Sequence, residues 1–189
     1  MQSHPTPKRL LSRLALTAAG CLALAACVTG TPADVIEGIG FREARYQQIQ
    51  MMREYRECRD QGLELDRRAR DAGSAGTYLA SARVLEKCEA AIGSDGAGLA
   101  LDERMRAYEL SIQNHFKGGD VEKARTNLDR FKERFSGKDL YYPDGTSFLL
   151  TMKALLGRKE SWSFGDFAAL NVNGTLKGEM RRMLHWNAR

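Results

Sequence analysis

The sequence predicts an all-α protein built from antiparallel helical hairpins. Apolar residues recur at intervals of three and four along most of the chain, glycine-rich breaks separate these stretches, and no strand-like alternation of any length is found. The 189 residues are enough for one ordinary domain. We therefore expect a single helical domain over residues 34–189, preceded by segments of a different character.

The longest periodic stretch follows Asp34, which can cap a helix that extends to about Ala72. One stripe of this helix is mostly apolar, whereas arginines and glutamates dominate the rest. Because Gln48 and Gly62 interrupt the stripe, we favour a helix packed within the domain over an oligomeric coiled coil. The stripe consists of Phe41, Ala44, Gln48, Met51, Tyr55, Cys58, Gly62, Leu65 and Ala69.

Glycine-rich loops bound the next two helices. Residues 73–76 end the first helix, and Thr77 or a neighbour begins a second helix that extends to about Ile92. Residues 93–98 contain three glycines and form a loop. A third helix is expected over residues 101–117, with its apolar residues facing inward.

Three shorter helices complete the predicted domain. Gly118 and Gly119 permit a sharp turn, and the side chain of Asp120 can cap the helix that follows. Thr146 or Ser147 begins the next helix. The three helices are expected to cover about 120–135, 146–157 and 175–186, with irregular chain over 158–174.

The first 26 residues have the character of a secretory signal peptide. Residues 1–13 are polar and basic, and residues 14–26 are apolar, uncharged and too short to cross ~30 Å of hydrocarbon as a helix. Leu24-Ala25-Ala26-Cys27 resembles the lipobox of bacterial lipoproteins. The resemblance implies cleavage before Cys27 and acylation of its thiol.

The mature protein is then expected to be held at a membrane by its N-terminal lipid, with residues 27–33 as a tether. Cys21 is a second candidate for acylation, but no large aliphatic residue stands three positions before it. The other alternative is a cleaved signal whose Cys27 carries no lipid. In enterobacterial lipoproteins an Asp after the lipidated Cys retains the protein in the inner membrane, so Val28 implies the outer membrane, facing the periplasm.

Charge argues against a nucleic-acid partner. The formal net charge is +5, but Lys8, Arg9 and Arg13 belong to the predicted signal peptide. Residues 27–189 carry 26 basic and 24 acidic residues, a net charge of +2. Such a dense mixture of both signs is typical of solvated helix faces.

Cys58 and Cys88 are the two cysteines that remain after processing. In an oxidising compartment an even pair is most simply a disulfide, and both residues lie on the apolar sides of their predicted helices. The alternative is two buried thiols that never meet. A metal site is not expected, because His115 and His185 are too dispersed to act as ligands with these cysteines.

Residues 105–135 resemble a tetratricopeptide repeat, a helical hairpin that stacks to form a concave peptide-binding face. The resemblance is carried by Tyr108, by the turn 119–121, and by Ala124 and Leu128 in the second helix. Ile112 and Phe131 depart from it, since the family places small residues there, and no proline follows. The resemblance implies a groove, and we expect Gln113 and Asn114 to point outward into it.

No constellation of catalytic residues is found, so we do not expect an enzyme or a cofactor. Residues 161–165 lack the first glycine of a nucleophile elbow and follow no strand. His115 falls on the inward face of its helix and is better explained as a core residue than as a catalytic base. Asp102 and Glu103 are adjacent in sequence and point apart on a helix.

The C-terminal region, 158–189, combines aromatic and basic residues. It either caps the apolar end of the helical stack or forms a partner-binding surface, for which Trp162, Arg181 and Trp186 are the candidates. The leading hypothesis for function is a non-enzymatic adaptor or scaffold that binds envelope proteins during their assembly or secretion. The alternative is a lipid-anchored module that binds cell wall or another ligand, and an enzyme comes third.

Overall fold

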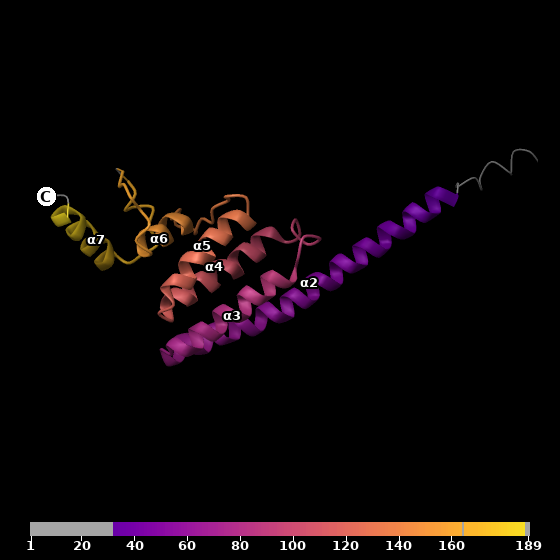
Figure 1. The fold of residues 1–189 in the computed structure, drawn as a ribbon, viewed down its shortest axis with the longest axis horizontal. Coiled ribbons are helices and arrows are strands. Elements are labelled where there is room, and N and C mark those ends of the chain that lie inside the picture. Colours follow the sequence, from indigo (N-terminus) through magenta and orange to yellow (C-terminus); the bar gives the residue numbers. More distant parts are fainter. Residues whose placement is uncertain (1–31, 164, 188–189) are drawn as a thin grey trace, which may run out of the picture. The chain divides into compact units, whose positions relative to one another are not determined.

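The computed structural model describes residues 32–163 and 165–187, and the side chains of residues 40–186 apart from residue 164. The regular elements within these ranges are helices, which confirms the predicted all-α class, and β-pairing there is limited to two isolated bridges. The predicted signal peptide and Cys27 lie outside the described residues. The helices are α2 (Pro32–Ala72), α3 (Ala75–Ala91), α4 (Leu101–Lys117), α5 (Val121–Arg134), α6 (Phe148–Leu155) and α7 (Gly174–Asn187) (Figure 1).

Side-chain caps fix several of the helix starts. The Asp120 carboxylate accepts a hydrogen bond from the backbone N–H of Lys123, so the predicted cap of α5 is confirmed. Ser147 caps α6 in the same way. The expected start of α3 at Thr77 was two residues late, because the side chain of Ser74 caps this helix. The predicted cap of α2 at Asp34 was also wrong, since the helix begins at Pro32, and proline suits a first helical position.

The chain divides into two compact units, residues 1–47 and 48–189, and α2 contributes to both. In the first unit the side chains of residues 40–47 are exposed, including Phe41 at 69 %. In the second unit the members of the predicted stripe from Met51 to Ala69 are buried or half-buried. The packed helix is therefore confirmed only over the second part of the stripe.

Close contact between α2 and α3 explains the glycine that interrupts this stripe. A Cβ atom at Gly62 would lie 2.5 Å from Cδ2 of Leu85, so a larger residue would require the buried Leu85 side chain to move. The hydroxyl of Ser81 donates a hydrogen bond of 2.7 Å to the Gly62 carbonyl. A disulfide joins Cys58 to Cys88, with 5.7 Å between the Cα atoms, as predicted.

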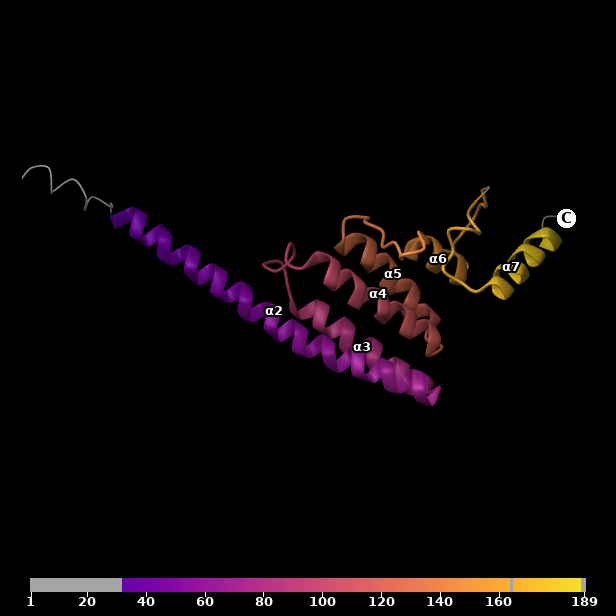
Figure 2. The ribbon, with the colours of Figure 1, turned by 180° about the vertical axis from the view of Figure 1, so that it is seen from behind.

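The main core lies among α4, α5 and α6, and Figures 1 and 2 show α4 and α5 side by side. Four aromatic rings meet at its centre: Phe131 is fully buried and lies 6.3, 4.8 and 5.1 Å from the ring centroids of Tyr108, Phe135 and Phe148. Ala124 is also fully buried, so the second helix of the hairpin approaches its neighbours closely. Phe131 thus fills the centre of the core rather than occupying the small-residue position of a repeat.

A buried arginine holds the glycine-rich loop between α3 and α4. Arg104 is 1 % exposed and donates to the carbonyls of Gly96, Ala97 and Leu99 over 2.7–3.1 Å. Its guanidinium also pairs with the carboxylate of Glu89, which is equally enclosed. The hydrogen bonds from Arg104 satisfy loop carbonyls that would otherwise be unpaired, so this one side chain holds the loop in place.

Candidate functional site

The expectation that Asn114 points outward was wrong, whereas Gln113 lines a cavity of about 220 Å³. Asn114 is fully buried and donates from Nδ2 to the hydroxyl of Ser81 over 3.1 Å. Gln113 is half-buried and donates to Glu109 Oε1 and to the Tyr142 hydroxyl, each over 2.9 Å. The physical reason is that α4 has α3 on one side and the rest of the core on the other, which leaves it little free polar face. A role for either residue in binding a partner stays a prediction.

His115 is a core residue, with 1 % of its surface exposed. Its Nε2 lies 3.5 Å from a carboxylate oxygen of Glu86 and its Nδ1 lies 3.8 Å from one of Asp120. Burial lowers the pKa of the imidazole, and the nearby Glu86 opposes this only in part. The ring is therefore neutral near pH 7, as expected of an imidazole enclosed in the core.

A hollow of about 370 Å³ lies between α3, α4 and α5, and four of its charged lining residues, Glu86, Glu89, Arg130 and Arg134, are already paired. Glu86 on its wall binds Lys123 and Arg130 over 2.8 and 3.0 Å. Glu89 pairs with Arg134 over 2.9 Å as well as with the buried Arg104. These ion pairs brace α5 against α3, so a ligand entering the hollow would have to break them.

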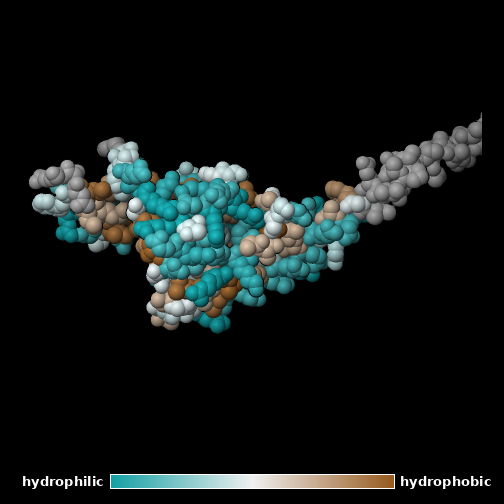
Figure 3. All heavy atoms as spheres, in the orientation of Figure 1, coloured by the Kyte–Doolittle hydropathy of each residue, from teal (hydrophilic) through white to brown (hydrophobic). Residues whose placement is uncertain are grey.

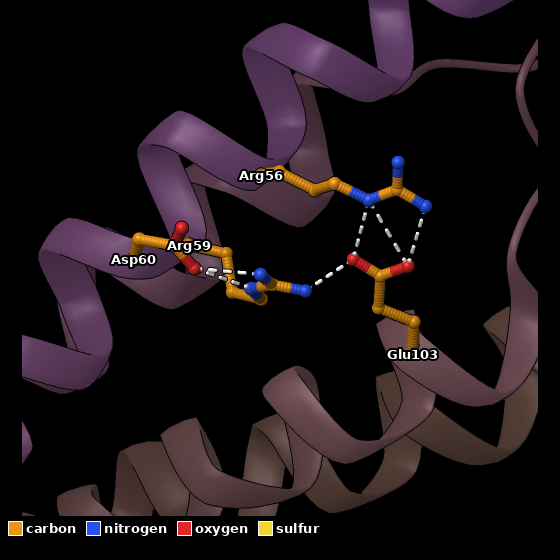
Figure 4. Close-up of polar contacts among 4 residues, drawn as sticks. All are labelled: Arg56, Arg59, Asp60 and Glu103. Atoms are coloured by element: carbon orange, nitrogen blue, oxygen red, sulfur yellow. Dashed lines mark hydrogen bonds and ion pairs between the residues drawn. The ribbon is translucent and has the colours of Figure 1, made fainter.

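Arginines of α2 pair with a glutamate of α4 at the surface (Figure 4). Nε and Nη2 of Arg56 donate to the carboxylate of Glu103 over 2.9 and 3.0 Å, and Arg59 binds the same carboxylate. The hydrogen bond from Arg56 lowers the pKa of Glu103. A carboxylate held ionised by two arginines is a poor proton donor, so this cluster is a link between helices.

In the C-terminal region two of the predicted site residues, Trp162 and Arg181, contact the same aromatic ring, that of Phe167. Phe167 stacks on Trp162, with 4.4 Å between ring centroids, and the guanidinium of Arg181 lies 4.9 Å from the Phe167 centroid. Lys159 covers Trp162, with Nζ 5.0 Å from the ring centroid, and pairs with Asp166 over 2.8 Å. This ladder joins the irregular segment to α7.

The third predicted residue, Trp186, is not part of the ladder. It lies near the end of α7 with 63 % of its surface exposed, and its ring contacts that of His185 at 6.0 Å between centroids. Sequence reasoning missed Lys159 and Phe167 as partners in the ladder. Neither residue follows a helical period, so only the folded segment places them beside Trp162.

An open groove of about 390 Å³ lies beside the ladder. Helices α6 and α7 and the irregular segment supply its walls, and most of its lining is apolar. Figure 3 shows apolar surface gathered over this part of the molecule. Its lining residues are Ala154, Leu155, Gly157, Lys159, Trp162, Leu176, Met180, Met183 and Leu184.

The part of the sequence that supplies this lining is rich in basic residues. Residues 153–189 contain seven basic and three acidic residues, a net charge of +4, whereas residues 27–152 have a net charge of −2. In the part of the chain that the structure describes, no carboxylate forms an ion pair with Lys153, Lys177 or Arg181. The groove therefore combines a mostly apolar lining with a stretch of the chain that carries a net positive charge.

Comparisons with protein-family models, with curated proteins and with solved structures found no match to this chain. Of the described helices, none is both long and apolar enough to cross a membrane. Among the described residues, no three or more His, Cys, Asp or Glu side chains are grouped so that they could hold a metal ion. The candidate site is therefore defined by the geometry and charge of the groove.

Proposed function

We propose that this protein is a non-enzymatic adaptor that is anchored to a membrane by a lipid on Cys27 and holds an envelope protein in the groove of α6 and α7. The observation that carries the proposal is the groove itself. It leaves Met183 at 61 % and Leu176 at 38 % exposure, whereas α3, α4, α5 and α6 leave no large apolar side chain exposed. Exposed apolar surface of this kind marks sites of protein binding.

The chemistry of the lining favours a protein over a sugar polymer. Met180 and Met183 have unbranched, polarizable side chains that adapt to the shape of different apolar partners. A polymer of sugars would instead need several convergent hydrogen-bonding groups, and Lys159 is the sole lining residue with a charged side chain. The alternative of a cell-wall module is therefore less well supported.

Two features of the sequence support the rest of the proposal. The lipobox-like Leu24–Cys27 supports a lipid anchor, and Val28 supports placement in the outer membrane, facing the periplasm. The tetratricopeptide-like residues of 105–135 support a scaffold role, because such hairpins hold a binding surface rigid. In this proposal the hairpin of α4 and α5 supports the groove and does not itself contact the partner.

The proposal is tested by crosslinking in intact cells. A photoreactive amino acid at Met183 should capture a specific protein, whereas the same amino acid at Arg83, an exposed position of α3, should not. Equal capture at both positions, or none at Met183, would overturn the assignment of the groove. Separately, Cys27→Ala should abolish fatty-acid labelling and release the protein from membranes, and continued labelling would show that another residue carries the lipid.

A further inference from the structure

We infer that the segment bound in the groove is an acidic amphipathic stretch of another protein, with one or two large apolar side chains flanked by carboxylates. This inference rests on the proposed function and gives the partner its chemistry. Three features of the groove support it: its shape, its lining and the charges around it.

The size of the groove suits a few side chains. Its volume of about 390 Å³ falls at the lower end of the range of about 300–1,000 Å³ that is typical of ligand pockets. Walls come from three different segments of the chain, so an inserted side chain would meet apolar surface on several sides. A partner helix or extended segment would therefore rest on the opening and insert its apolar side chains.

The lining can accept apolar side chains of different shapes, but it discriminates little between them. Leu176, Met180, Met183 and Leu184 all come from α7, where they recur at intervals of three and four residues along one face. Their contacts with an apolar side chain are not directional. Selectivity must then come from the polar groups around the opening.

Those polar groups are cationic. Lys177 and Arg181 lie one helical turn apart on α7, and neither forms an ion pair with a carboxylate of the described residues. Hydrogen bonds from Thr146 lower the pKa of Asp144, and the charge of Lys177 adds a smaller, longer-range effect. Stacking on Phe167 holds the Arg181 guanidinium in place without satisfying its charge. A partner carboxylate would gain a charge-assisted hydrogen bond there, and opposite charge would speed the encounter.

A concave site favours a protein segment over an anionic membrane surface. A helix that lies on a membrane presents its apolar side chains outward on a convex face. Here Met180 and Leu184 are half-buried and line a cavity together with Ala154 and Leu155 of α6. Lipid headgroups would reach the cations but not fill this cavity.

The experiment uses the protein as purified from cells, held in nanodiscs of zwitterionic phosphatidylcholine, with empty nanodiscs as the background. Three fluorescent amphipathic peptides share the same leucines and carry glutamate, glutamine or lysine at their polar positions. Fluorescence anisotropy should show the glutamate peptide binding about tenfold more tightly than the glutamine peptide, because each tenfold step needs only about 1.4 kcal/mol of additional interaction. The difference should shrink at high salt.

A matched pair of variants separates the groove from charge in general. The double change Lys177→Gln and Arg181→Gln should remove the preference for glutamate. Arg83→Gln with Lys87→Gln is the control, because these two exposed cations have the same spacing on α3. Circular dichroism must show that both double variants remain folded, and the uncharged change Met183→Gln should weaken all three peptides by a similar factor.

Equal binding of the glutamate and glutamine peptides, or tighter binding of the lysine peptide, would overturn the inference. So would retention by phosphatidylglycerol vesicles that depends on Lys177 and Arg181 while the peptides do not bind, since this would identify a membrane surface. Self-association lost in the same double variant would identify a second copy of the chain. If crosslinking at Met183 captures a protein but the peptides show no charge preference, the adaptor stands and only the acidic partner is wrong.

Discussion

The hairpin of α4 and α5 and the groove of α6 and α7 place apolar and charged side chains in opposite ways. In the hairpin the aromatic rings are buried and even Arg104 is enclosed with its carboxylate partner. On α7, Met183 and Trp186 are more than half exposed, and Arg181 lies over the ring of Phe167 and forms no ion pair with a carboxylate of the described residues. The comparison shows that the hairpin satisfies its apolar and charged groups within this chain, whereas in the proposed function a partner completes the groove.

The largest expected effect tests whether the aromatic cluster is the centre of the hairpin. Phe131→Ala should lower the free energy of unfolding by about 3–5 kcal/mol, because it removes a fully buried ring that contacts three others. Urea unfolding followed by circular dichroism measures the change. Tyr141→Ala is the control, since this ring is 63 % exposed and its loss should have a small effect. Similar losses for both variants would contradict the assignment of the core.

Loss of the disulfide should have the next largest effect on the free energy of unfolding. Replacing Cys58 and Cys88 together by alanine should lower the free energy of unfolding by roughly 3–4 kcal/mol, because the bridge closes a loop of about 30 residues in the unfolded chain. Reduction of the natural protein should give a similar loss in urea unfolding. Rapid alkylation of both thiols without a reductant would show that the bridge does not form in the cell.

Hydrogen bonds between helices should contribute less than the bridge. Ser81→Ala removes the acceptor used by Asn114 and the donor to the Gly62 carbonyl, and it should lower stability by about 1–3 kcal/mol. The exposed Ser161→Ala is the control. The same reasoning assigns a similar loss to Asn114→Ala, in place of the small surface effect that an outward-pointing residue would have. A loss below the error of measurement would mean that Asn114 does not depend on Ser81.

The pH dependence should reveal the buried imidazole. Burial lowers the pKa of His115 below 6.5 in the folded state, so the unfolded chain binds more protons as the pH falls through this value. Stability should therefore fall below about pH 6.5, with a slope of at most about 1.4 kcal/mol per pH unit for this one group.

His115→Gln should flatten the dependence in that range, as measured by urea unfolding at several pH values. Glu109 acts in the opposite sense, because burial raises its pKa and its contribution declines as the pH rises above 4.5. Glu109→Gln therefore serves as the control, since it should leave the His115 slope in place. An unchanged profile in His115→Gln would mean that another group accounts for the loss of stability at low pH.

The smallest effect on stability is expected for Trp186, near the end of the helix that lines the groove. This prediction gives the clearest contrast between the groove and the hairpin. Trp186→Ala should change the free energy of unfolding by less than about 0.5 kcal/mol, because most of the ring is exposed. The same change should lower the yield of crosslinked partner at Met183. A loss of several kcal/mol would instead show that the C-terminal helix closes the core, as a simple cap would.

The features that the sequence determined by itself are those that depend on local chemistry. Apolar spacing located all the described helices, and the range 101–117 agrees with α4 at both ends. Asp120 and Ser147 could be recognised as caps because a cap depends on hydrogen bonds within one turn of helix. The pairing of Cys58 with Cys88 was also predictable, because these are the two cysteines outside the predicted signal peptide and lipobox, and two cysteines allow one bridge.

Burial was decided by the tertiary structure. Phe41 belongs to the same stripe as Tyr55, yet the first is exposed and the second is buried, because only the second meets other helices. Asn114 lies inside because α4 is covered on two sides, and Arg104 lies inside because loop carbonyls surround it. The groove likewise depends on where α6, α7 and the segment between them meet. A periodic pattern shows which residues share a face, but distant segments determine what that face contacts.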